Sequence, residues 1–168
     1  MKNPIIKINV KNLGSMTAEL YPEKAPLTVA NFVKLAEEGF FEGLIFHRVI
    51  RGFMIQGGGY TEDMEHKETD SIKGEFKANG FMQNDLKHTR GVLSMARTSD
   101  PNSASSQFFV MHMDAPHLDA QYAGFGKLTD GFDVLDAIAN VKTGNYGWYM
   151  QDVPKVPVVI EKMEIVSR

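Results

Sequence analysis

The most informative stretch of this 168-residue sequence is FHRVIRGFMIQGG at residues 46–58. Two apolar runs, 46–50 and 54–56, flank Arg51-Gly52, which is typical of two short strands joined by a turn. Within a strand at 46–50, Phe46, Arg48 and Ile50 share one face. An arginine on the apolar face of a strand is costly unless it has polar partners. We therefore expect Arg48 either to reach the polar rim of the sheet or to belong to a functional site.

The residues themselves leave two interpretations of Arg48 open. In the first, the side chain extends to the rim of the sheet, and Gln56 satisfies a backbone group. In the second, Arg48 forms a site with the ring of Phe53 and the amide of Gln56, which follow closely in the sequence.

On the N-terminal side, the alternation of apolar and polar residues predicts strands at 5–10 and 16–20, with a turn at 12–14. A helical pattern then runs from Pro26, which fits the first turn, to Gly39, which fits the position just after the end. Its apolar residues recur at helical spacing. They are Val29, Phe32, Val33, Leu35 and Ala36.

On the C-terminal side, residues 60–90 are polar and poorly periodic, and we expect them to cross the surface without regular structure. Residues 97–106 and 142–157 are predicted loops, the second with Trp148 as a surface anchor. Asp130 is a candidate cap for a second helix whose apolar residues begin at Phe132 and end at Ala139. Further strands are predicted at 92–96, 107–111, 122–128 and 158–166, the last with an irregularity at Glu161-Lys162.

About eight strands and two helices follow from these patterns, and strands and helices do not alternate as they would in a parallel sheet. The predicted fold is all-β dominated, a closed eight-stranded antiparallel β-barrel capped by two α-helices. Such closure leaves no sheet edge exposed. We expect one domain over residues 1–168.

Composition excludes several classes. Net charge is −3, and 43% of residues are hydrophobic, as in ordinary globular proteins. Nothing indicates a general nucleic-acid or membrane surface. The chain has no cysteine, which excludes disulfides and thiolate metal sites. The first ten residues lack the apolar run of a signal peptide, so the cytoplasm is the expected location.

Several parts of the sequence resemble known catalytic motifs but do not match them. Gly57-Gly58-Gly59 is not followed by a helical pattern, as a phosphate-binding loop requires, and Gly126-Lys127 precedes Leu128 where Ser or Thr would hold Mg²⁺. His112 and His117 lack helical spacing and a nearby third ligand. The serines at 103, 105 and 106 lack the context of a nucleophile. We therefore expect no cofactor and no metal.

Four blocks in the same order resemble the cyclophilins, the peptidyl-prolyl cis–trans isomerases, over residues 5–166. The likeness is to compact single-domain bacterial members. It implies the barrel fold inferred above and the acceleration of rotation about X–Pro bonds in proline-containing polypeptides, as an aid to folding. The blocks are 46–58, 91–96, 106–109 and 118–127.

By this resemblance, Arg48, Phe53 and Gln56 are the catalytic residues. Met54, Phe109 and Leu118 complete the proline pocket with Phe53, and the backbone of Ala96 and Arg97 pairs with the substrate. The remaining substrate-binding residues implied are Thr98, Ser106, Gln107, His117 and Tyr122.

Three of these positions depart from common family residues. His117 stands where Trp is frequent, so we expect weakened binding of cyclosporin-type macrocycles. Tyr122 replaces a frequent His, and it can still donate a hydrogen bond to a substrate carbonyl. Arg97 replaces a frequent Asn, and its charge favours acidic substrate residues.

The alternative function is a non-catalytic binding module or chaperone for proline segments. A hydrolase that uses serine and histidine has no motif in the sequence. By resemblance, the protein is expected to be a monomer. Arginine does not titrate near neutrality, so an isomerase of this kind is expected to have a flat rate profile between about pH 6 and 8.

Overall fold

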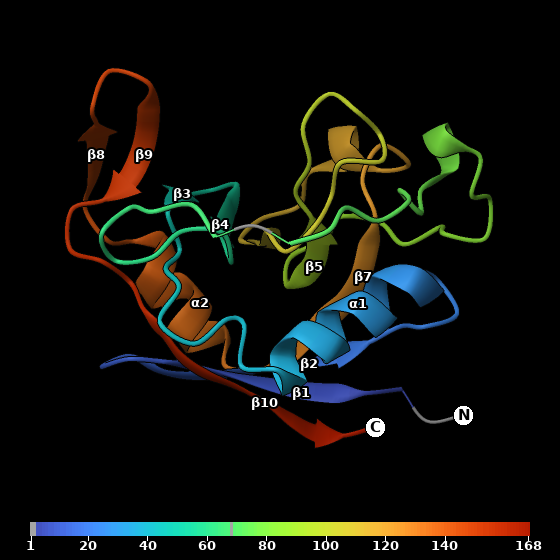
Figure 1. Ribbon diagram of the computed structural model, residues 1–168, viewed down its shortest axis with the longest axis horizontal. Coiled ribbons are helices and arrows are strands. Elements are labelled where there is room, and N and C mark those ends of the chain that lie inside the picture. The colour runs from blue at the N-terminus through green and yellow to red at the C-terminus, as the bar shows by residue number, and fades with distance from the viewer. Residues whose placement is uncertain (1–2, 68) are drawn as a thin grey trace.

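The computed structural model describes residues 3–67 and 69–168 (Figure 1). Strands dominate, as predicted. The strands are β1 (Ile5–Val10), β2 (Gly14–Leu20), β3 (Arg48–Ile50), β4 (Met54–Gly57), β5 (Val92–Met95), β6 (Phe108–Met111), β7 (Gly124–Asp130), β8 (Thr143–Tyr146), β9 (Met150–Pro154) and β10 (Ile160–Ser167). The helices are α1 (Pro26–Glu37) and α2 (Phe132–Ala139), with 3₁₀ turns η1 (Lys77–Asn79) and η2 (Pro116–Leu118).

Eight strands form one antiparallel sheet in the order β10-β1-β2-β7-β5-β6-β4-β3. The prediction of a closed barrel is wrong, because the sheet is an open, curled half-barrel with β10 and β3 as its edges. The partner of β10 is the segment just before β3. Ile160 donates to the carbonyl of Leu44 at 2.8 Å, and Phe46 donates to that of Val158 at 3.0 Å. These bonds involve the start of β10 and the residues just before it, while β3 remains the last strand of the sheet.

The first helix has the predicted boundaries. It begins at Pro26, and Gly39 follows its end with a φ of 74°. The predicted cap of the second helix is wrong. Asp130 is the last residue of β7, and Gly131, with a φ of 87°, precedes α2 without a side-chain cap. A Cβ at Gly131 would lie 2.4 Å from the carbonyl oxygen of Ser15, so only glycine fits this approach to β2.

In the C-terminal third, one more prediction is wrong and one predicted irregularity is confirmed. Residues 142–157, predicted as a loop, contain the β8–β9 hairpin, which projects beside β3 at one end of the molecule (Figure 1). Trp148 lies at its tip and is 95% exposed. In β10, the pairing passes from Asn9↔Lys162 to Val10↔Ile160, so Glu161 bulges out, as predicted.

Two hydrophobic clusters lie on opposite faces of the sheet. The larger one includes Phe32, whose ring lies 5.0 Å from that of Phe125 and 5.2 Å from that of Phe108. The smaller one contains Met54, Val92, Phe109, Met111, Ala115 and Leu118. Strand β6 alternates between the two: Phe108 faces the first and Phe109 the second. The second cluster forms the floor of the candidate site.

Residues 60–90 have no strand or α-helix in the part that the structure describes, as expected from their composition. No helix among the described residues has the length and apolarity to cross a bilayer.

Candidate functional site

Strand register places four side chains in one row. Arg48 of β3 pairs with Gln56 of β4, Gln56 pairs with Phe109 of β6, and Phe109 pairs with Ser94 of β5. Directly paired residues project from the same face of a sheet. A cation and an amide from the β3–β4 hairpin and an aromatic ring from the distant β6 therefore lie side by side.

A cavity of about 150 Å³ opens along this row. Its floor is apolar, because Met54, Phe109 and Leu118 belong to the smaller hydrophobic cluster and are almost completely buried. Arg48 is exposed at its edge. The lining residues are Arg48, Phe53, Met54, Gln56, Ala96, Arg97, Phe109, Leu118 and Tyr122. All of them were named from the sequence.

A chain of amides orients the guanidinium. Arg48 Nη1 donates to Gln56 Oε1 at 3.3 Å, and Gln56 Nε2 donates to Gln107 Oε1 at 3.0 Å. The Gln56 carbonyl is thereby turned towards Arg48. This is the only hydrogen bond of the Arg48 side chain within the described residues, so further N–H groups of the fork point to solvent or to a bound molecule.

Arg97 also lines the cavity. Its guanidinium lies 4.8 Å from the ring centre of Phe76 and 4.6 Å from that of Tyr122. It donates to the carbonyls of Thr98 at 2.9 Å and Gln121 at 2.6 Å. Tyr122 in turn meets the ring of Phe109 edge-on at 5.8 Å. Arg97 thus keeps its charge at the site while it fixes the wall formed by Tyr122.

A second cavity of about 210 Å³ adjoins the first and shares Gln56, Ala96 and Arg97 with it. Of the residues expected to border this region, Thr98 and Gln107 line it, but Ser106 does not. Ser106 is 1% exposed, and its hydroxyl donates to the Gly58 carbonyl. The lining residues that the sequence did not single out for this cavity are His66, Ser103 and Ser105.

His117 lies beside the first cavity without lining it. The residue is exposed, and its ring stacks on Phe53 with centroids 5.8 Å apart and an interplanar angle of 29°. The imidazole therefore supports Phe53 from outside and does not form a wall of the cavity.

A polar triad with a buried histidine and a buried serine supports the floor, and no sequence signal indicated it. His88 Nε2 lies 2.8 Å from Ser94 Oγ, and His88 Nδ1 lies 3.2 Å from Asp119 Oδ1. The His88 ring stacks against Phe109 with centroids 6.1 Å apart. Burial lowers the pKa of His88, and the hydrogen bond with Asp119 opposes this effect only in part. His88 is therefore neutral near pH 7.

The three side chains contact one another in the order Ser–His–Asp, as in a serine hydrolase, but the serine here is buried. Ser94 is 0% exposed beside Phe109 on the neighbouring strand, where a substrate carbonyl has no access. Residues 3–67 and 69–168 contain no group of three or more His, Asp or Glu side chains suited to a metal ion. His112 and His117 point into different surroundings.

The comparisons with known proteins agree with this geometry. The model of the cyclophilin-type peptidyl-prolyl cis-trans isomerases matches residues 5–165. A peptidyl-prolyl cis-trans isomerase of Acinetobacter baylyi is 49% identical over 93% of this chain and 82% of that protein. The isomerase B of Escherichia coli is 45% identical over 92% of this chain and 95% of its own.

Solved structures show the same fold. A cyclophilin-type isomerase of Cryptosporidium parvum matches with a TM-score of 0.81 and 30% identity over 99% of both chains. Its crystal structure in the presence of the dipeptide Ala-Pro matches with a TM-score of 0.80 and 31% identity, over 98% of this chain and 99% of that one. The chain thus belongs to the family of cyclophilin-type peptidyl-prolyl cis–trans isomerases.

Proposed function

We propose that this peptidyl-prolyl cis–trans isomerase accelerates X–Pro rotation without covalent chemistry, with Arg48 as its electrostatic catalyst. Rotation about an amide has a barrier of about 18–20 kcal/mol, because the C–N bond has partial double-bond character. In the twisted amide that character is lost, and the prolyl nitrogen regains a lone pair. A fixed cationic donor directed at this nitrogen stabilises the twisted form more than either planar form.

One observation carries the proposal: Arg48 stands at the edge of an apolar cavity, held by Gln56 at 3.3 Å. The fork uses one N–H to fix its direction and offers others to the substrate. A guanidinium stays charged at every pH at which the protein is folded. A pocket that only binds proline would not need a cation at this place.

The proline ring belongs, in this proposal, on the floor formed by Met54, Phe109 and Leu118, against the ring of Phe53. Burial of an aliphatic ring of this size contributes roughly 1.5–3 kcal/mol. The ring is held while the preceding acyl group turns. The Cryptosporidium relative whose structure was determined in the presence of Ala-Pro supports a proline-containing ligand.

Residues before the proline would extend across Ala96 and Arg97 towards the second cavity. The Ala96 N–H already donates to the Gln107 carbonyl at 3.0 Å, which leaves the Ala96 carbonyl and the Arg97 N–H for strand-like pairing with a peptide. The Arg97 guanidinium lines both cavities and favours an acidic side chain in the second. Thr98 and Gln107 would contact the same side chain.

Some sequence predictions stay predictions. These are the organisation of residues 1–168 as one domain, the monomeric state, the cytoplasmic location, the part in folding, and the weakened binding of cyclosporin-type macrocycles. The position of His117, stacked outside on Phe53, supports the last of these.

The test is two-dimensional NMR exchange on an Ala-Pro peptide with wild type, Arg48→Ala and Arg48→Lys. Arg51→Ala is the matched control, because Arg51 is exposed and lines neither cavity. Loss of a preorganised donor costs on the order of 10²–10³ in turnover, so Arg48→Ala should fall by that amount with an unchanged fold, and Arg48→Lys by less. The control should match wild type.

Two outcomes contradict the proposal. Near wild-type exchange with Arg48→Ala would remove Arg48 from the mechanism. Line broadening of the peptide by wild type without faster exchange would instead identify a proline-binding module that does not catalyse.

A further inference from the structure

The turn between β3 and β4 is held from one side by the residue that follows β6. The backbone N–H of Gly52 donates to His112 Nδ1 at 2.9 Å, and the backbone N–H of His112 donates to the carbonyl of Phe53 at 2.9 Å. One residue thus contacts the N–H of the first residue and the carbonyl of the second residue in the Gly52–Phe53 pair. Phe53 is the residue whose ring lines the proline cavity.

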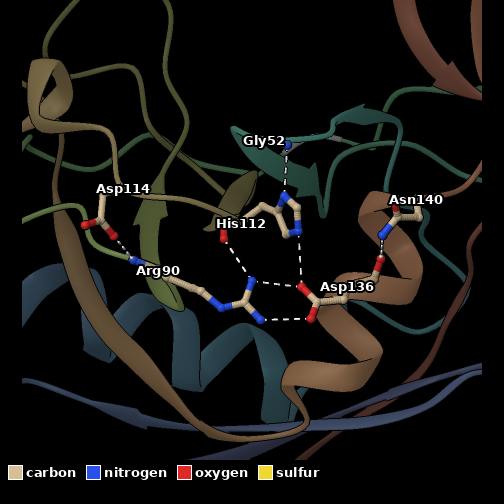
Figure 2. Close-up of polar contacts among 6 residues, drawn as sticks. All are labelled: Gly52, Arg90, His112, Asp114, Asp136 and Asn140. Carbon is tan, nitrogen blue, oxygen red and sulfur yellow. Dashed lines mark hydrogen bonds and ion pairs between the residues drawn. The ribbon is translucent and has the colours of Figure 1, made fainter.

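The contact with Gly52 defines the tautomer of His112. Since Nδ1 accepts a hydrogen bond from an N–H group, the proton of the neutral ring is on Nε2. Nε2 lies 3.1 Å from Asp136 Oδ1 on α2. Figure 2 shows the imidazole between Gly52 on one side and the Asp136 carboxylate on the other. The His112 side chain is 13% exposed.

Arg90 fixes the carboxylate in turn. Its Nη1 and Nη2 donate to the two oxygens of Asp136 at 2.8 and 2.9 Å, a two-pronged pair (Figure 2). Nη1 also donates to the backbone carbonyl of His112 at 3.0 Å. The hydrogen bonds from Arg90 lower the pKa of the Asp136 carboxyl. The carboxylate therefore remains an acceptor for the imidazole proton.

The tip of this turn is exposed to solvent. Arg51 and Gly52 are exposed, and a Cβ added at Gly52 would meet no atom within 4 Å. Gly52 has a φ of 81°, and the Phe53 N–H closes the turn on the Ile50 carbonyl at 3.0 Å. A side-chain acceptor for the Gly52 N–H therefore restricts a turn that is otherwise open to solvent.

We infer that His112 is a positioning residue, which holds the Gly52–Phe53 turn and thereby the Phe53 ring at the proline cavity, in the tautomer that Asp136 and Arg90 select. The inference rests on the proposed function in one respect, the part of Phe53 in proline binding. It adds a link from α2 to the cavity, through side chains that do not touch the substrate.

Two substitutions separate the roles of the two ring nitrogens. His112→Asn keeps an acceptor near the position of Nδ1 and loses the contact with Asp136. His112→Gln keeps a donor near the position of Nε2 and loses the acceptor for Gly52. Isomerisation of an Ala-Pro peptide and ¹⁵N relaxation dispersion of the Gly52 and Phe53 amides would be measured for both, beside Arg48→Ala.

We expect His112→Gln to raise KM by about three- to tenfold, the effect of one lost hydrogen bond, with kcat within about twofold of wild type. Its Gly52 and Phe53 amides should show new exchange broadening. His112→Asn should stay within about twofold of wild type in KM and lack the broadening. A long-range ¹H–¹⁵N spectrum of the wild-type imidazole should show Nδ1 without a proton.

A protonated Nδ1 in the neutral wild type, wild-type behaviour of His112→Gln, or an equal loss in both variants would overturn the inference. Failure of the proposed mechanism has a different signature. It would appear as retained kcat in Arg48→Ala, while the amide exchange at Gly52 and Phe53 would still report on His112.

Discussion

The carboxylate of Glu75 accepts a hydrogen bond from the backbone N–H of Thr28 at 2.7 Å and a second one from its hydroxyl at 2.8 Å. Glu75 Oε2 also accepts from the N–H of Leu27 at 3.1 Å. The residue before α1, Ala25, supplies no side-chain cap. A buried acid from residues 60–90 therefore caps a helix far away in the sequence, where it also meets the positive end of the helix dipole.

We expect Glu75→Ala to lower the free energy of unfolding by about 2–4 kcal/mol, because it leaves buried N–H groups without an acceptor. Glu75→Gln, which keeps one acceptor and loses the charge, should cost less. Urea unfolding followed by circular dichroism gives both values. Glu62→Ala, an exposed acid of the same segment, is the control. A change below about 0.5 kcal/mol for Glu75→Ala would contradict the capping role.

His47 should make the stability of the fold depend on pH. The residue is 5% exposed, and its Nδ1 has no hydrogen-bond partner in the part of the chain that the structure describes. Burial first, and then the charge of Arg48, lowers the pKa of His47 to about 4. Between that value and the unfolded pKa of about 6.5, the unfolded chain binds a proton that the folded chain does not.

The contribution of His47 is therefore fully present above about pH 6.5 and is lost as the pH falls towards 4. Its size is on the order of 3 kcal/mol. His47→Leu should flatten the unfolding free energy over this window relative to wild type, as measured by urea titrations at several pH values. An identical pH dependence in the two proteins would show that His47 is not the source.

The role of the triad formed by His88, Ser94 and Asp119 can be tested by a substitution at Ser94. We expect Ser94→Ala to lower the unfolding free energy by about 1–2 kcal/mol, since His88 loses its partner at Nε2. Isomerase turnover should persist, because Ser94 is completely buried and lines neither cavity. Wild type should not react with a fluorophosphonate, as mass spectrometry can show. Labelling of Ser94 would mean that the triad opens and that a hydrolytic function must be considered.

His117→Trp is predicted to raise the affinity for cyclosporin. A larger indole at this place would extend the ring surface beside Phe53, on which His117 now stacks, and would add an N–H donor. An increase of about tenfold or more corresponds to roughly 1.4 kcal/mol, which titration calorimetry resolves. The same affinity for wild type and variant would place the cause of weak binding elsewhere.

The residue pattern predicted the β3–β4 hairpin, and the resemblance to the cyclophilins selected Arg48, Phe53 and Gln56 as its functional residues. The spacing of Arg48, Phe53 and Gln56 around a short turn can be read from one stretch, because a hairpin fixes its own register. His88, Ser94 and Asp119 come together only through tertiary packing. Strands buried on both faces, such as β6, lack the alternation that would assign Phe109 to the cavity, so only the family resemblance placed Phe109 there.

The prediction of a closed barrel was wrong for a related reason. The residues that pair with the start of β10 and with the residues just before it lie at 43–46, and all but Phe46 precede the strand predicted at 46–50. The number of strands was therefore nearly right and their connection was not. The β8–β9 hairpin escaped because its exposed residues carry no alternating pattern: Tyr146, Trp148 and Tyr149 all face solvent.

Trp148 has a practical consequence for every experiment on this protein. It is the only tryptophan in the chain, and it is 95% exposed at the tip of the hairpin. Its indole is as exposed to water in the native protein as in the unfolded one. Its emission wavelength therefore gives almost no signal for unfolding or for peptide binding. A fluorescence experiment therefore requires the replacement of Trp148 and a single tryptophan at position 117, where the probe would lie next to the ring of Phe53.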